Sequence, residues 1–164
     1  IDQSVKVELP PGSSPAHLDR LFKELETIDA NDKTQLAQQL HGLAERLPRR
    51  SLVILLSDLW LEPGDLIKAL QHLRYRKHQA MVLHLLDKAE IELPYDRQVT
   101  LQDLETNEKL QIDPADIREV YKQQVGAYLT GVRRACVDSD IEYHSIYVDQ
   151  PYERALIELL SRRS

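Results

Sequence analysis

The sequence has little of what several large protein classes require. Its single cysteine, Cys136, excludes an internal disulfide framework and a zinc site built from cysteines. Only five glycines are present, and there is no Gly-x-Gly-x-x-Gly motif, no phosphate-binding lysine loop and no Gly-x-Ser-x-Gly elbow. The longest apolar runs, 52–56 and 81–86, are far shorter than the roughly 20 residues that span a bilayer. We therefore predict no membrane segment in this chain and no familiar nucleotide or hydrolase motif.

Positive charge is also in deficit. The 164 residues contain 21 Lys and Arg against 27 Asp and Glu, which gives a formal net charge of −6. An acidic chain is a poor match for nucleic acids or anionic membranes, so we expect neither as a main partner. The lone cysteine and the absence of a signal peptide favour a cytoplasmic location.

Short apolar runs alternate with longer helical patterns along the chain, and this alternation is typical of an α/β domain. Three runs predict buried parallel strands: Ser51–Ser57, Ala80–Leu86 and Ile141–Val148. A period of two over Val5–Leu9 predicts a further edge strand. Helices are expected after Ser14-Pro15, Asp32, Pro63, Asp113-Pro114 and Pro151. No linker divides the chain, so residues 1–164 are interpreted as one domain.

A polar stretch interrupts the pattern before the longest helix. Val99–Leu101 and Leu110–Ile112 flank Glu105-Thr106-Asn107-Glu108, which predicts a β-hairpin. We interpret residues 97–112 as a hairpin insertion between a strand and its crossover helix.

Each predicted parallel strand ends in an aspartate: Asp58, Asp87 and Asp149. The carboxyl ends of parallel strands share one edge of the sheet, where ligands bind in open α/β folds. Thr34 begins the helix before the first of these strands and would reach the same edge. Carboxylate and hydroxyl oxygens suit Mg²⁺ or Mn²⁺. The alternative is that these aspartates cap the helices that follow.

Four other residues have a structural and a functional interpretation. Trp60 follows Asp58 directly and either plugs the loop or contacts a partner. His84 and His144 lie within strands, where a hydrogen-bonded histidine is expected rather than a metal ligand. Cys136 continues the apolar stripe of the long helix, which predicts a buried, unreactive thiol.

Several segments together resemble one bacterial family. They are Ser51–Leu59 (S-L-V-I-L-L-S-D-L), His84–Pro94 (H-L-L-D-K-A-E-I-E-L-P), Asp103–Thr106 (D-L-E-T), Tyr121 and Ile141–Pro151. This is the family of domain of unknown function 58, which is similar to von Willebrand factor A domains. The resemblance implies a Rossmann-like, three-layer sheet with a metal-ion-dependent adhesion site.

In that family pattern an Asp-x-Ser-x-Ser loop, a threonine and an aspartate hold the metal. By position Thr34 would be the threonine and Asp58 the aspartate, with Asp87 and Asp149 at the periphery. The loop itself is absent, because Asp2-Gln3-Ser4 is followed by Lys6 where the second serine would stand. The resemblance therefore implies an incomplete metal site in a partial domain that lacks the first strands. One edge of Ser51–Ser57 would then be exposed, which favours pairing with another chain or self-association.

The resemblance implies a non-enzymatic protein-interaction module, with divalent metal as a further element of binding. It also implies work with MoxR-type AAA+ ATPases in chaperone-like assembly. One alternative is a Mg²⁺-dependent hydrolase that uses Asp58, Asp87 and Asp149 as a carboxylate cluster. A second alternative is a metal-free scaffold.

Overall fold

The computed structural model describes residues 7–10, 12–27, 36–48, 50–59, 62–102 and 107–151, together with Glu153, Ile157 and Ser161. The helices are α1 (Pro15–Thr27), α2 (Leu36–Arg46), α3 (Pro63–Tyr75), α4 (Lys88–Glu92) and α5 (Pro114–Asp138). The strands are β1 (Leu52–Ser57), β2 (Gln79–Leu86), β3 (Val99–Gln102), β4 (Lys109–Ile112) and β5 (Glu142–Tyr147). Glu153, Ile157 and Ser161 are helical, at the place where the last helix is predicted.

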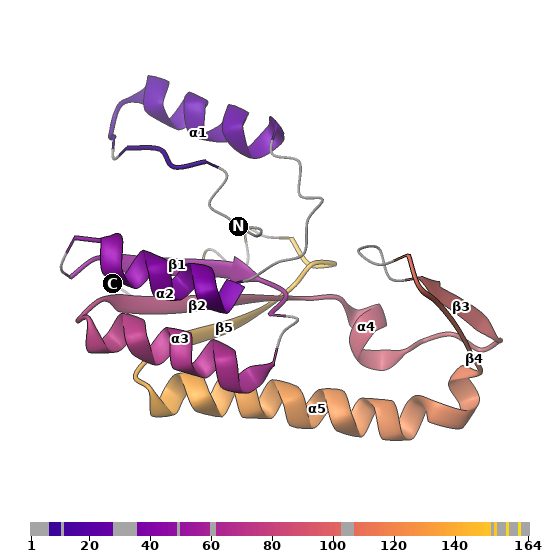
Figure 1. Cartoon of the computed structure of the whole chain (residues 1–164). Helices are drawn as coiled ribbons and strands as arrows, with labels where there is room; N and C mark the ends of the chain where they lie inside the picture. Colours follow the sequence, from indigo (N-terminus) through magenta and orange to yellow (C-terminus); the bar gives the residue numbers. More distant parts are fainter. Residues whose placement is uncertain are drawn as a thin grey trace.

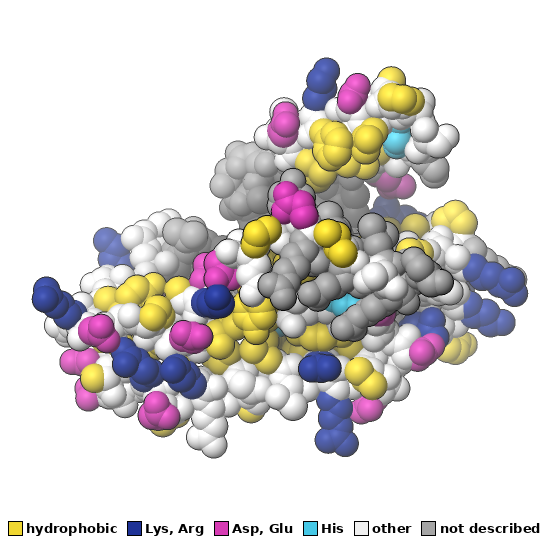
Figure 2. Space-filling view, turned by 180° about the vertical axis from the view of Figure 1, so that it is seen from behind, with side chains coloured by type: hydrophobic (Ala, Val, Ile, Leu, Met, Phe, Trp, Pro, Cys, Tyr) yellow, Lys and Arg dark blue, Asp and Glu magenta, His cyan; other side chains and the backbone are white. Residues whose placement is uncertain are grey.

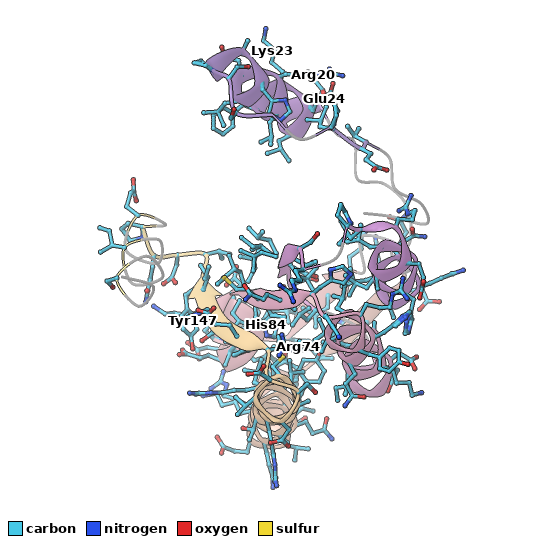
Figure 3. All side chains as sticks on the ribbon, turned by 90° about the vertical axis from the view of Figure 1, so that its left-hand side faces the viewer. Arg20, Lys23, Glu24, Arg74, His84 and Tyr147 are labelled. Atoms are coloured by element: carbon cyan, nitrogen blue, oxygen red, sulfur yellow. The ribbon has the colours of Figure 1, made fainter. Side chains whose placement is uncertain are left out.

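The three predicted parallel strands form one sheet in the order β1-β2-β5. Leu55, Val82 and Tyr143 are aligned across it, so their side chains share one face. Helices α3 and α5 lie against that face (Figures 1 and 3). The α/β class and the parallel sheet are confirmed.

The core lies between this face of the sheet and the helices. Leu40 of α2, Leu70 of α3 and Val132 of α5 are almost fully buried against it. The remaining members are mostly aliphatic: Leu36, Ala44, Leu55, Leu59, Leu66, Ala69, Leu73, Ala80, Val82, Cys136 and Ile141. Burial of these apolar side chains is the main force that holds the sheet to its helices.

The predicted hairpin is present as a separate two-stranded sheet. β3 and β4 pair antiparallel, with Val99 opposite Ile112. Asn107 has a positive φ of 58°, and its Oδ1 atom accepts a hydrogen bond from Gln102 Nε2 at 3.0 Å. The Asp103–Thr106 segment lies outside the described residues.

The other face of β1 is open. Leu52, Ile54 and Leu56 are 42%, 46% and 61% exposed, and in the described part of the sheet β1 pairs with β2 alone. α1 lies on this side but apart from the sheet (Figures 1 and 3). None of its residues is buried, and Figure 2 shows hydrophobic side chains gathered on its surface. The exposed hydrophobic residues of α1 include Leu18, Phe22 and Leu25.

Two local predictions differ from the structure. Residues 7–9 of the predicted strand Val5–Leu9 have no regular secondary structure, and residues 5 and 6 lie outside the described ranges. An alternating pattern forms a strand only where a neighbouring strand supplies hydrogen bonds, and Val7 is exposed. The second difference is α4, whose five residues are too few to show a helical period in the sequence. No helix in the described ranges combines the length and the apolar character that crossing a membrane requires.

Candidate functional site

The turn that follows β1 places Asp58 at the carboxyl edge of the sheet. Leu59 adopts a left-handed conformation, with φ at 54°, and its side chain is completely buried. Its backbone N–H donates to Ser57 Oγ at 3.0 Å, and the Ser57 hydroxyl donates to Asp58 Oδ1 at 3.4 Å. A non-glycine residue in this conformation persists only where its surroundings fix it.

His84 of β2 is one of the groups that fix this turn. Its Nε2 atom lies 2.8 Å from the Asp58 carbonyl oxygen, and its Nδ1 atom lies 2.8 Å from the Tyr143 hydroxyl. A carbonyl only accepts, so Nε2 carries the proton and Nδ1 accepts from Tyr143. Burial lowers the pKa of His84, although the hydrogen bond to Asp58 opposes the shift. The prediction of a hydrogen-bonded core histidine is confirmed, and Figure 3 shows His84 within the sheet.

α5 holds the same turn from the helical side. The Tyr128 hydroxyl donates to the carbonyl oxygen of Leu59. Burial raises the pKa of Tyr143 to about 12, so the hydroxyl that faces His84 also stays protonated. The backbone of Asp58 and Leu59 is therefore held by side chains from β2 and α5, while the Asp58 side chain remains exposed.

A cavity of about 540 Å³ opens beside this turn. It lies between the carboxyl ends of β1 and β2, α4 and the first half of α5. The lining residues are Asp58, Glu62, His84, Leu86, Glu90, Ile91, Tyr121, Gln124, Val125, Tyr128 and Leu129. The Tyr121 hydroxyl donates to the Glu90 carbonyl and so joins α5 to α4 across the cavity. We call this cavity the edge pocket.

The edge pocket combines apolar walls with acidic side chains. Leu86, Ile91, Val125 and Leu129 supply aliphatic surface, and the two tyrosines supply rings. Among the described residues of the lining, three are acidic and none is lysine or arginine. Apolar walls with a few polar groups are typical of ligand-binding pockets of this volume.

The other two strand-end aspartates have structural roles. Asp87 caps α4, because its Oδ1 atom accepts from the Ala89 N–H at 2.8 Å. Asp149 Oδ2 lies 2.6 Å from Lys88 Nζ, and this contact raises the pKa of Lys88. The described residues contain no group of three or more His, Cys, Asp and Glu that could hold a metal ion. The carboxylate cluster of Asp58, Asp87 and Asp149 that a hydrolase would need is therefore not formed.

Comparison with known protein families identifies the family of this chain. The pattern described as "Protein of unknown function DUF58" matches residues 1–128 of the chain. The chain belongs to this family. The family resemblance noted from the sequence is thus confirmed. No curated protein sequence matches the DUF58 chain.

One solved structure is similar to the DUF58 chain. It is the crystal structure of conserved hypothetical protein BatB from Bacteroides thetaiotaomicron. The sequences are 11% identical, the match covers 89% of this chain and 68% of that one, and the TM-score is 0.48.

The metal ligands predicted for the DUF58 chain are only partly described. Thr34 and Trp60 lie outside the described residues. The position of Thr34 relative to Asp58 therefore stays a prediction. Asp58 offers one exposed carboxylate with the Ser57 hydroxyl beside it. Mg²⁺ requires six oxygen ligands in near-octahedral geometry. These two groups alone do not form such a site.

The edge pocket of the DUF58 chain is not evident from the sequence. Tyr121, Val125 and Tyr128 share one face of α5 at helical spacing, and this apolar stripe predicts a core contact. In the structure only the second half of the stripe, at Val132 and Cys136, is buried. The first half extends beyond the sheet and lines the pocket. The helical spacing of these residues predicts an apolar face, but it does not show that this face lines a cavity.

A histidine pair between α2 and α3 is likewise missed by sequence reasoning. His41 Nδ1 and His72 Nδ1 are 2.9 Å apart, and His72 Nε2 lies 2.9 Å from Glu45 Oε1. The two histidines are far apart in the sequence, so their approach depends on how α2 packs against α3. Neither histidine is among the residues that line the edge pocket, and the pair belongs to the interface between α2 and α3.

Proposed function

We propose that this DUF58 chain is a non-enzymatic protein-interaction module that binds a protein partner at the carboxyl edge of its sheet. The observation that carries the proposal is the edge pocket next to the anchored Asp58 turn. The pocket offers shape and apolar surface, which recognition needs. Its described lining contains no serine, cysteine or lysine, and its histidine is neutral with both ring nitrogens in hydrogen bonds. Such a lining favours binding over catalysis.

The nature of the partner is a second part of the proposal. The resemblance between this family and von Willebrand factor A domains supports a Rossmann-like domain of that kind. The same resemblance supports a MoxR-type AAA+ ATPase as the partner, in chaperone-like assembly. Trp60 follows the anchored turn, and a tryptophan at that place suits a contact with a partner.

Divalent metal is a separate element of the proposal. Thr34 and Asp58 are the residues that the resemblance assigns as ligands for Mg²⁺ or Mn²⁺. Thermal unfolding with each cation tests this part on its own. Saturating cation is expected to raise the midpoint by a few degrees, because a ligand that binds only the folded state stabilises it. The rise should be absent in Asp58→Ala, and equal rises in both proteins would reject the metal site.

The direct test of the interaction is binding of the purified chain to a purified MoxR-type ATPase. Biolayer interferometry would compare the parent chain with Asp58→Asn and Trp60→Ala, with and without Mg²⁺. Asp19→Asn on the exposed surface of α1 is a matched control for the loss of one carboxylate. We expect the two edge variants to weaken binding and the control to leave it unchanged. Equal binding by all four proteins would contradict recognition at the carboxyl edge.

The hydrolase alternative is tested on the same proteins. A panel of phosphomonoester and phosphodiester substrates with Mn²⁺ should show no turnover, since the three aspartates do not form a cluster. Turnover that is lost in Asp58→Asn would overturn the non-enzymatic proposal. A chain that binds the ATPase equally with and without cation would favour the metal-free scaffold.

A further inference from the structure

The interior of the edge pocket offers apolar contacts and few free hydrogen-bonding groups. The Tyr121 and Tyr128 hydroxyls donate to the backbone carbonyls of Glu90 and Leu59, and both ring nitrogens of His84 are engaged. A small polar molecule would therefore find few partners inside. An aliphatic or aromatic side chain would find the walls formed by Leu86, Ile91, Val125 and Leu129.

The charged side chains that the structure describes at the rim of the pocket are acidic. Glu62 and Glu90 are exposed, and neither carboxylate is in an ion pair with a described residue. Asp58 adds a third acidic side chain, and no lysine or arginine is among the lining residues that the structure describes. Anionic ligands are repelled from such a site and cationic groups are attracted to it.

Apolar walls within an acidic rim define the chemistry of the occupant. We infer that the edge pocket binds a segment of the partner protein in which a large hydrophobic side chain stands next to Lys or Arg. The hydrophobic side chain fills the cavity, and the cationic side chain lies at Glu62 and Glu90. The cavity of about 540 Å³ has room for a large side chain and part of its neighbour. This inference rests on the proposed function, because it names what the interaction module recognises.

The inference is tested with a synthetic probe instead of an unidentified partner. The probe is a short fluorescein-labelled peptide of alternating Leu and Lys, and its binding is followed by fluorescence anisotropy at low salt. Two further peptides replace every Lys with Glu or every Leu with Ser. The pocket requires both properties, so the Leu-Lys peptide should bind and the other two should not.

Two variants alter the pocket and two matched variants alter the surface elsewhere. Glu62→Gln with Glu90→Gln removes the rim charges, whereas Glu26→Gln with Glu119→Gln removes two exposed charges outside the pocket. Val125→Phe narrows the cavity, whereas Val120→Phe adds the same bulk to an exposed position of α5. We expect the rim variant to lower affinity about tenfold, with the difference shrinking as NaCl is added. Val125→Phe should abolish binding, and both controls should bind like the parent.

Methyl NMR locates the probe on the parent protein. Addition of the Leu-Lys peptide should shift the methyl signals of Ile91, Val125 and Leu129 and leave those of Val120 and Val137 in place. Far-ultraviolet circular dichroism confirms that each variant is folded. Absence of binding, equal binding by the Glu peptide, equal affinities for all variants, or shifts outside the pocket would each overturn the inference.

Binding to the MoxR-type ATPase distinguishes a failure of this inference from a failure of the proposed function. If Asp58→Asn and Trp60→Ala lose the ATPase while the rim variant and Val125→Phe retain it, the module binds its partner without the pocket, and the inference fails alone. If no protein binds the ATPase but the Leu-Lys peptide occupies the pocket, the inference stands and the proposed partner is wrong.

Discussion

His84 and Asp58 are joined by a hydrogen bond of 2.8 Å from the imidazole Nε2–H to the Asp58 carbonyl oxygen. Because Tyr143 donates to the other ring nitrogen at 2.8 Å, one imidazole connects the turn after β1 and the strands β2 and β5. The histidine is only 1% exposed, so all its polar contacts are with protein. The turn that presents Asp58 therefore depends on a buried group 26 residues away in the sequence.

Loss of the His84 ring should destabilise the whole sheet. His84→Ala removes two buried hydrogen bonds and leaves a cavity, together with an Asp58 carbonyl and a Tyr143 hydroxyl that have lost their partner. We expect the free energy of unfolding to fall by about 2–4 kcal/mol. Urea unfolding followed by circular dichroism measures this change. Tyr143→Phe keeps the ring and removes one hydrogen bond, so it should cost less, about 1–2 kcal/mol. Equal costs for the two variants would contradict the central position of His84.

The same histidine should make stability depend on pH. Burial lowers the pKa of His84 in the folded protein below its ordinary value of 6.5. The folded state therefore binds fewer protons here than the unfolded chain, and stability rises with pH across the interval between the two pKa values. The contribution of neutral His84 to stability is complete above pH 6.5 and is lost as the pH falls through the pKa of His84 in the folded protein. Urea unfolding between pH 8 and pH 5 should show this loss.

His84→Gln is the control for that pH series, because the chain contains five other histidines. Glutamine has a donor and an acceptor but no charge in this range. The parent protein should lose more stability than His84→Gln between pH 7 and pH 5. Parallel pH curves for the two proteins would show that His84 is not the group responsible.

Cys136 should resist thiol reagents in the folded protein. It is 1% exposed in the core beneath the sheet, and burial raises its pKa to about 11. At pH 8 the thiolate, which is the reactive form, is therefore rare and is shielded as well. Reaction with a chromogenic disulfide reagent should be slow in buffer and fast in urea. Rapid reaction of the folded chain would contradict the buried position.

The parallel strands and the hairpin could be predicted because their signals are local. The predicted runs Ser51–Ser57 and Ala80–Leu86 are mostly apolar. Asp113 with Pro114 marks the start of α5, where Asp113 Oδ1 accepts from the Ala115 N–H at 3.0 Å. Caps and strand patterns depend on neighbouring residues, so the sequence contains them. The family followed from motifs in the same segments.

Only the location of the candidate site, at the carboxyl edge of the sheet, could be predicted from the sequence. The aspartates at the strand ends located the edge of the sheet, but the roles of Asp87 and Asp149 depend on their contacts with Ala89 and Lys88. The edge pocket arises where α5 extends past the sheet and meets α4, and no local pattern encodes that geometry. The apolar face of α1 shows the same limit, because periodicity identifies an apolar face but not the surface that covers it.

The open side of β1 predicts self-association. Leu52, Ile54 and Leu56 expose apolar surface, and in the described sheet the outer edge of β1 has no neighbouring strand. An edge strand with an apolar face is a template for pairing with another chain. We expect sedimentation velocity to show species heavier than 19.0 kDa whose proportion rises with protein concentration.

A charge on the open face should suppress that association. Ile54→Lys places an ammonium group on the edge strand, which is a common device against strand pairing. Val120→Lys, at an exposed position in the first half of α5, introduces the same charge on a helix instead of on β1. The first variant should sediment closer to a monomer at every concentration, and the second should behave like the parent chain. If both variants associate as the parent does, the contact lies elsewhere, and if the parent is monomeric throughout, the β1 edge does not pair with a second copy.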